Sequence, residues 1–166
     1  MTRAGVDQLL YMLDRAFAPI DDDVEHSLLH NLEAVTEDDF LRAAPNGNRT
    51  IVQITWHAAA AKLMYANHCF GDGTLTWDEL FNHWEGKPSK TEMIDWLREA
   101  HAEFRGLIEP LDDGALTVER KAPWGAMHET RWIVAQIIEH DVYHAGEINL
   151  IRALLQDTDS RPTFDE

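Results

Sequence analysis

The sequence predicts an all-α protein, and three observations indicate this fold class. Apolar residues recur at helical spacing along four long segments of the chain. Gly, Pro and Asp cluster between these segments, where turns are expected. Only residues 115–121 partly alternate as a strand does, and one short run cannot form a sheet. Long helices with an apolar side are expected to pack as a bundle, whose interior side chains can build a site.

Turn and cap signals divide the first third of the chain. Pro19 and the acidic run at residues 21–23 interrupt an apolar pattern and supply helix caps, and Pro45 opens a Pro-Asn-Gly-Asn turn. The expected helices are residues 7–17, residues 24–35 and a further helix start at residues 36–39.

Two capping boxes mark the next two long helices. Thr50 is followed by Gln53, and Ser89 is followed by Glu92, each at the spacing that closes a helix N-terminus. Glycines at residues 71 and 73 end the first of these helices, and Pro110 ends the second. The expected long helices are residues 50–70, 90–109 and 129–156, with a short helical turn at residues 77–84.

Size and composition predict a single cytoplasmic domain over residues 1–166. A chain of this length with 45% hydrophobic residues can bury one ordinary core. No stretch approaches the roughly 20 apolar residues of a membrane helix, and the first residues lack the pattern of a signal peptide. No membrane partner is therefore expected.

The charge and the single cysteine restrict the partners. Lys and Arg total 14 against 30 Asp and Glu, and the net charge of −16 repels phosphate backbones. Nucleic-acid binding is therefore not expected. Because Cys69 is the only cysteine, a thiolate-rich metal site is excluded, and any metal must use nitrogen and oxygen ligands.

His140 and His144 are four residues apart on the apolar side of the last helix, so one ion can reach both rings. Burying two imidazoles among aliphatic side chains costs free energy unless their nitrogens find partners, and a cation is one such partner. The same side of the helical projection carries Ile133, Ile137, Tyr143, Ile148, Leu150, Ile151, Leu154 and Leu155. The opposite side, expected nearer to solvent, carries Glu139, Asp141, Asn149 and Arg152.

His57 is the third candidate ligand, since it occupies an inward position on the helix expected at residues 50–70. His68 lies roughly 16 Å further along the same helix, too far to share an ion with His57. Three imidazoles suit Zn²⁺, Ni²⁺ or Co²⁺ and leave a coordination position open for water or substrate. The remaining histidines are interpreted as surface or unpaired residues: His26, His30, His83, His101 and His128.

Glu147 also points inward, seven residues after His140. Three roles are open for this candidate catalytic residue: orienting a ligand imidazole, acting as general base, or binding the metal. Gln53, one turn before His57, is a weaker candidate for supporting the site.

The sequence resembles the DinB/YfiT-like superfamily. His57 in Trp-His-Ala-Ala, together with the closing His-Asp-Val-Tyr-His-Ala-Gly-Glu that begins at His140, carries the resemblance, and the order of helices agrees over residues 7–156. The resemblance implies a four-helix bundle with a long crossover and short extra helices. It also implies a divalent metal, often Zn²⁺ or Ni²⁺, held by His57, His140 and His144. Many relatives have Gln where this chain has Glu147.

Activities in that superfamily imply a small-molecule substrate. They include S-transfer with bacillithiol or mycothiol and a mycothiol-dependent maleylpyruvate isomerase, and other members are assigned only as metal-dependent hydrolases. We therefore expect a metal-dependent transferase or hydrolase, with a low-molecular-weight thiol as co-substrate in the first case. The alternatives are a non-catalytic metal-binding or stress-related bundle, and a bundle without metal. Apolar helix faces are also compatible with a homodimer.

Overall fold

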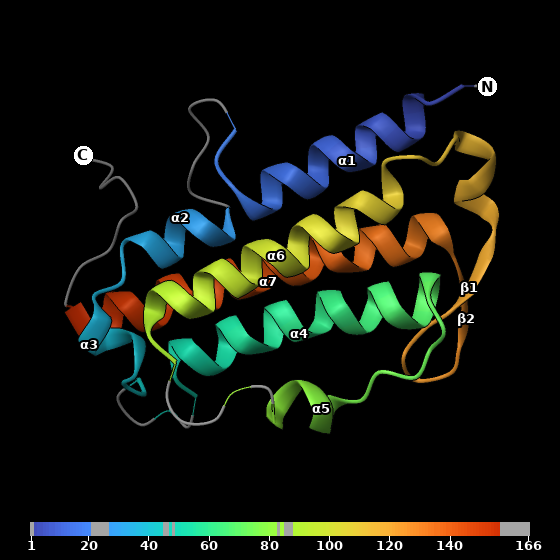
Figure 1. The fold of residues 1–166 in the computed structure, drawn as a ribbon. Coiled ribbons are helices and arrows are strands. Elements are labelled where there is room, and N and C mark those ends of the chain that lie inside the picture. Colours follow the sequence, from blue (N-terminus) through green and yellow to red (C-terminus); the bar gives the residue numbers. More distant parts are fainter. Residues whose placement is uncertain are drawn as a thin grey trace, which may run out of the picture.

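The computed structural model describes residues 2–20, 27–44, 47, 49–82, 84 and 88–156. Its elements follow the order in Figure 1. The helices are α1 (Ala4–Phe17), α2 (Leu28–Glu33), α3 (Glu37–Phe40), α4 (Ile51–Phe70), α5 (Trp77–Asn82), α6 (Lys90–Ile108), a 3-10 turn η1 (Asp113–Thr117) and α7 (Thr130–Gln156). Two short strands, β1 (Glu119–Lys121) and β2 (Met127–Glu129), lie between η1 and α7.

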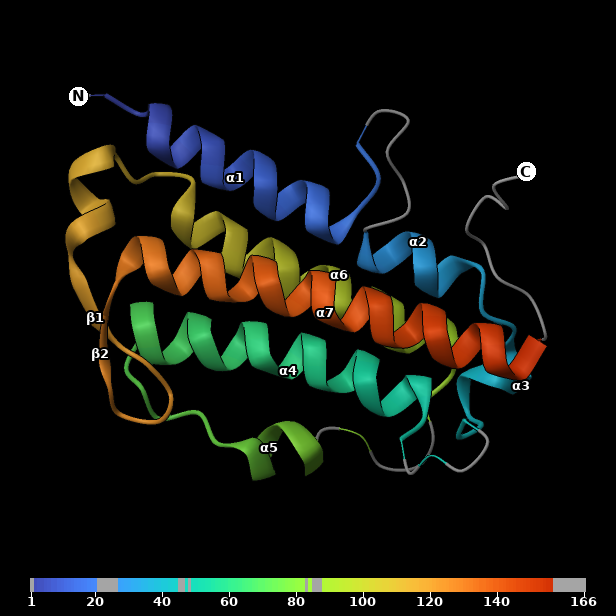
Figure 2. The same cartoon turned by 180° about the vertical axis from the view of Figure 1, so that it is seen from behind.

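The four long helices α1, α4, α6 and α7 form the bundle (Figures 1 and 2). Helices α4 and α6 run in the same direction, so the chain returns along the bundle between them, and α5 lies on this crossover. Helix α7 runs antiparallel to α4 and packs against it. The predicted all-α four-helix bundle with a long crossover is therefore confirmed.

Both capping boxes start their helices as expected. The Thr50 hydroxyl accepts a hydrogen bond from Gln53 N, and the Gln53 side chain accepts one from Thr50 N. Ser89 and Glu92 do the same for α6. Each box satisfies backbone N–H groups that have no partner within the helix, and this fixes where the helix begins. The caps expected at residues 21–23 lie outside the described residues.

One expectation about the connection before α7 is wrong. The structure forms a small antiparallel sheet in which Arg120 pairs with His128, whereas the sequence predicted no sheet. Gly125, at a φ of +93°, turns the chain between the two strands. The end of the alternating run forms β1, and it pairs with β2, whose residues do not alternate in the way that predicts a strand. The first part of that run, residues 115–117, belongs to the helical turn η1 and is not extended.

The apolar core consists of two clusters along the bundle. The first contains residues such as Leu28, Phe40 and Leu97, and the second contains residues such as Phe104 and Ile133. On α6 and α7, buried polar residues lie between the part of the helix that belongs to the first cluster and the part that belongs to the second. On α4, a buried polar residue lies near the boundary between the two clusters. This polar belt comprises Lys62, His101, Asp141 and His144.

None of the helices in the described part of the chain combines the length and the apolar character that crossing a membrane requires.

Candidate metal centre

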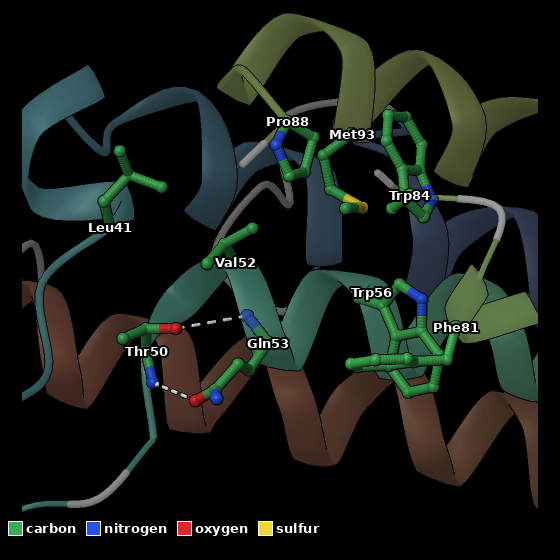
Figure 3. A pocket seen from close by; sticks show the side chains of 9 residues that line it. All are labelled: Leu41, Thr50, Val52, Gln53, Trp56, Phe81, Trp84, Pro88 and Met93. Atoms are coloured by element: carbon green, nitrogen blue, oxygen red, sulfur yellow. Dashed lines mark hydrogen bonds between the residues drawn. The ribbon is translucent and has the colours of Figure 1, made fainter. Parts of the chain in front are cut away.

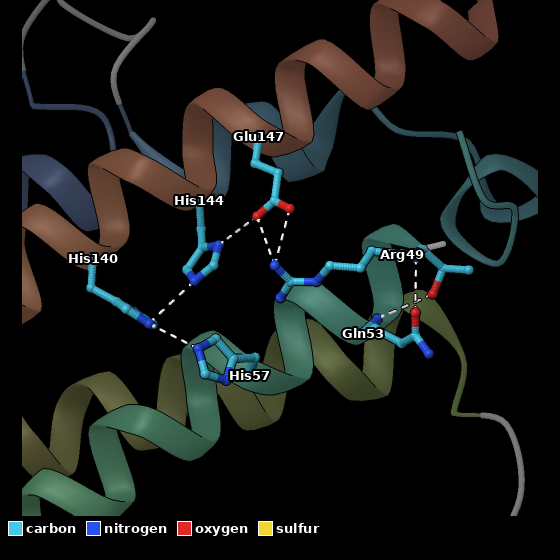
Figure 4. A network of polar contacts seen from close by, with 7 residues as sticks. Arg49, Gln53, His57, His140, His144 and Glu147 are labelled. Carbon is cyan, nitrogen blue, oxygen red and sulfur yellow. Dashed lines mark hydrogen bonds and ion pairs between the residues drawn. The ribbon is translucent and has the colours of Figure 1, made fainter. Parts of the chain in front are cut away.

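Three imidazoles meet between α4 and α7 (Figure 4). His57 comes from α4, and His140 and His144 come from α7. His140 Nε2 lies 3.1 Å from His57 Nε2 and 3.2 Å from His144 Nε2. The expected convergence of these three side chains is confirmed, whereas their role as metal ligands stays a prediction.

The separation of the nitrogens fits a divalent ion. Ligand nitrogens at about 2.0–2.1 Å from an ion are about 2.9 Å apart at a right angle and about 3.4 Å apart at the tetrahedral angle. The two Nε2–Nε2 distances, 3.1 and 3.2 Å, lie between these limits. The ligand atoms of all three side chains lie within 4.8 Å of one another, so two of the three separations already match those around a shared ion.

Hydrogen bonding among the rings cannot satisfy all three nitrogens. Glu147 Oε2 lies 2.9 Å from His144 Nδ1, which places the His144 proton on Nδ1 and leaves a lone pair on Nε2. His140 Nε2 then contacts two imidazole nitrogens, and a single proton can form only one linear hydrogen bond. A cation accepts all three lone pairs at once, so the donor set fits a metal.

Burial keeps the three imidazoles neutral, the form that binds metal ions. Loss of solvent lowers the pKa of His57 and of His144, and it lowers the pKa of His140 to about 3. Repulsion between neighbouring imidazolium groups adds to the effect for His57 and His140. At neutral pH each ring therefore carries one proton, so a cation does not have to remove a second proton from any of them.

Glu147 and Arg49, both partly exposed, lie beside His144 (Figure 4). Arg49 Nη1 lies 3.1 Å from Glu147 Oε1 and 3.4 Å from Oε2. The carboxylate of Glu147 thus connects the guanidinium to His144 Nδ1. This is the contact that orienting a ligand imidazole requires. Sequence reasoning missed Arg49 because it precedes α4 in a segment without periodicity.

The predicted support from Gln53 is not present. Its side chain is exposed and its carbonyl oxygen accepts a hydrogen bond from Thr50 N, as Figure 3 also shows. The side-chain amide of Gln53 can either cap α4 or contact the histidines, and in the structure it caps the helix.

An aromatic side chain covers His57 instead. Trp77 of α5 stacks on the imidazole, with ring centroids 5.8 Å apart and an interplanar angle of 15°. Trp77 also contacts Trp56, the residue before His57. The crossover between α4 and α6 therefore provides a wall of the site.

The expected faces of α7 need two corrections. Tyr143, Leu150 and Leu154 are exposed, although the sequence placed them with the core. Asp141 and Arg152 are buried, although the sequence placed them near solvent. At about 100° per residue, the buried residues of α7 centre about 90° around the helix from His140, so the sequence prediction centred the buried face on the wrong direction. Charged residues were assigned outward because their partners on other helices were unknown.

The partner of Asp141 is Lys62 of α4. Its ammonium group donates to Asp141 Oδ1, and neither side chain is exposed. Loss of solvent raises the pKa of Asp141 and lowers that of Lys62, while each partner's charge opposes the shift of the other. This ion pair lies one residue from His140 and five from His57.

The other histidines lie outside the cluster. His26 and His83 fall outside the described residues, and His30 is partly buried and does not join the three. His68 Nε2 contacts Leu75 O at 2.9 Å, in keeping with its place at a helix end. His128 stacks on Trp132.

His101 is buried, although no partner for it was found in the sequence. Its ring stacks on Phe17 with centroids 3.7 Å apart, and its Nε2 lies 3.3 Å from Asp14 Oδ1. Both partners belong to α1, and no local sequence pattern could identify them.

A separate cavity of about 420 Å³ lies between α3, α4, α5 and the start of α6 (Figure 3). Apolar side chains dominate its lining, and none of the three clustered histidines takes part in it. Its lining residues are Leu41, Thr50, Val52, Gln53, Trp56, Phe81, Trp84, Pro88 and Met93.

The fold and the site define a class of four-helix bundles with a three-histidine cluster between two helices. The sequence of residues 21–148 matches the model of the DinB superfamily, and the chain belongs to this superfamily. No curated protein matches the chain.

We expect His101 to make the metal-free protein less stable in mild acid. Burial and the charge of Lys62 lower its pKa to about 4, so between that value and about 6.5 only the unfolded chain takes up the proton. Its contribution is complete above about pH 6.5 and is lost as the pH falls toward 4. From pH 7 to 5, wild type should lose about 1–2 kcal/mol more than His101→Gln in urea unfolding.

Leu97→Ala serves as the control for this measurement. It removes buried packing from the same helix without adding or removing a titratable group, so its effect should be similar at both pH values. Equal losses in wild type and His101→Gln would contradict the assignment of the pH dependence to His101.

Proposed function

We propose that the protein is a divalent-metal-dependent enzyme acting on a small molecule, in which His57, His140 and His144 hold the ion. The observation that carries the proposal is the convergence of three neutral imidazoles, whose ligand atoms lie within 4.8 Å of one another. Zn²⁺ or Ni²⁺ suits such a donor set. When bound, the metal lowers the pKa of a water or thiol at its open position.

The residues around the histidines have separate tasks in this proposal. Glu147 holds the proton on His144 Nδ1, so that the lone pair of Nε2 faces the metal. Arg49 holds the carboxylate of Glu147 in that position. Trp77 stacks on one face of His57 and limits the orientations of its ring. Glu147 and Arg49 are positioning residues, since they act through His144.

Two reaction types use the same site. Hydrolysis needs only an activated water, whereas S-transfer needs a thiolate of a low-molecular-weight co-substrate to attack an electrophile. Membership in the DinB superfamily supports a metal site but does not choose between the reactions. A non-catalytic metal-binding or stress-related bundle is the alternative, and it predicts no turnover by the metal-loaded protein.

We expect the purified protein to carry about one divalent ion per chain, and the double variant His140→Ala, His144→Ala to carry almost none. The double variant removes two of three ligands from one helix. Elemental analysis after gel filtration measures this. His26 and His30 are also four residues apart, and His30 lies outside the cluster of three histidines. His30→Ala is therefore the matched control, and it should keep the metal. Equal metal content in wild type and the double variant would contradict the assignment.

Turnover by the metal-loaded protein should separate the two reactions. With a generic electrophile, product formation that rises with added bacillithiol or mycothiol indicates S-transfer, whereas hydrolysis of a generic ester without thiol indicates the second reaction. The metal-free protein is the control for both assays. If no assay gives turnover above that control, the non-catalytic alternative is favoured.

Substitutions at Glu147 distinguish its orienting role from that of a general base. Glu147→Gln keeps an acceptor for His144 Nδ1, so metal affinity should stay within about threefold of wild type, whereas Glu147→Ala should weaken it about 10- to 100-fold. Competition with a chromophoric chelator measures both. A Gln variant that binds metal normally but loses most of kcat, with a shifted pH profile, would indicate the general-base role instead.

A further inference from the structure

Lys62 and Asp141 connect the two helices that carry the histidines. Lys62 follows His57 by five residues on α4, and Asp141 directly follows His140 on α7. The ammonium group donates to Asp141 Oδ1, lies 5.7 Å from the centre of the Phe17 ring, and is completely buried. Within the described part of the chain, Asp141 Oδ2 has no hydrogen-bond partner. Lys62 is thus the main polar contact of this buried carboxylate.

Stability does not explain why this pair is present. Two charges lose their solvation here, and the attraction between buried partners often fails to offset that loss. Apolar residues of similar volume are frequently as good or better for stability at such positions. Unlike apolar packing, however, a buried ion pair is directional, because its two charged groups meet in only one arrangement of the two helices.

The surface of α4 between His57 and Lys62 offers little else to fix that arrangement. Residues 58–61 form a complete helical turn of four alanines, all of them buried. Methyl groups let another helix approach closely, but their shallow ridges resist sliding along the axis less than large interlocking side chains do. A shift by one residue moves a helix by about 1.5 Å.

Only one of the three histidines depends on this register. His140 and His144 share α7, so the geometry of a single helix sets their separation. His57 reaches them from α4, with its Nε2 at 3.1 Å from His140 Nε2. Because metal–imidazole bonds are confined to about 2.0–2.1 Å, a slip of one residue is enough to remove His57 from the site.

We propose that the Lys62–Asp141 ion pair fixes the register of α4 against α7 and thereby holds His57 at coordinating distance from His140 and His144. Both members are positioning residues for a metal centre that they do not touch. The proposal rests on the metal site proposed above. Its particular consequence is that losing the pair converts a three-histidine site into a two-histidine site.

The test replaces both charges together, in Lys62→Met with Asp141→Leu, so that no unpaired charge stays buried. We expect this variant to fold with a Tm equal to or above that of wild type. Its Co²⁺ and Zn²⁺ affinities, measured by chelator competition, should fall about 10- to 100-fold, and its Co²⁺ absorption should change as in His57→Ala. Adding His57→Ala to the pair variant should weaken binding less than about threefold further, because His57 has already left the site.

Ile133→Val is the matched control. It alters a buried position on α7 in the second core cluster, away from the histidines, and should leave the affinity and the Co²⁺ spectrum unchanged. If the Met/Leu variant does not fold, Lys62→Met with Asp141→Asn preserves the volume at residue 141 and undergoes the same measurements.

A crystal structure of the metal-free pair variant makes the proposal independent of metal binding. The distance from His57 Nε2 to His140 Nε2 should increase from 3.1 Å by about 1.5 Å or more. A folded pair variant with wild-type affinity, spectrum and Nε2–Nε2 distance overturns the proposal. If wild type itself binds no metal, the proposed function fails, and this distance alone then decides whether the pair sets the register.

Discussion

The close contact between α4 and α7 at the three histidines is the constraint on which the site depends. One ring comes from the middle of the chain and two come from its last helix, and His140 Nε2 lies 3.1 Å from His57 Nε2 and 3.2 Å from His144 Nε2. Loss of solvent keeps the rings neutral, while the carboxylate of Glu147 holds the proton of His144 on the outer nitrogen. The arrangement therefore directs more lone pairs to one point than protons can satisfy, and a cation resolves this.

The site lies where the apolar core is interrupted. On α6 and α7, the first cluster of buried apolar residues and the second are separated by polar side chains, among them His101 and Asp141. These polar residues find their partners across helices: His101 contacts Asp14 of α1, and Asp141 contacts Lys62 of α4. The two clusters supply the hydrophobic stabilisation of the bundle, and the belt between them supplies directed contacts that specify which residues face one another.

The sequence was sufficient for the bundle and for the candidate ligands, because both depend on local periodicity. Long apolar stripes and two capping boxes identified the main helices, and the inward positions of His57, His140 and His144 follow from spacing within single helices. The buried charges could not be found in this way. Lys62 and Asp141 each look like a solvated residue until its partner, on another helix, is known. The same holds for Arg49, whose role depends entirely on Glu147.

Two ion pairs join the α4 side of the site to α7, and their surroundings give them different roles. Arg49 and Glu147 are 45% and 20% exposed, so solvent and salt screen their attraction and the contact can rearrange when a ligand arrives. Lys62 and Asp141 have no exposed surface, so breaking their contact leaves unsolvated charges in the core. The histidines thus lie between an adaptable contact at the open edge and a fixed contact in the interior. In the enzyme proposed above, such an arrangement keeps the positions of the three histidines constant while the edge of the site responds to a substrate.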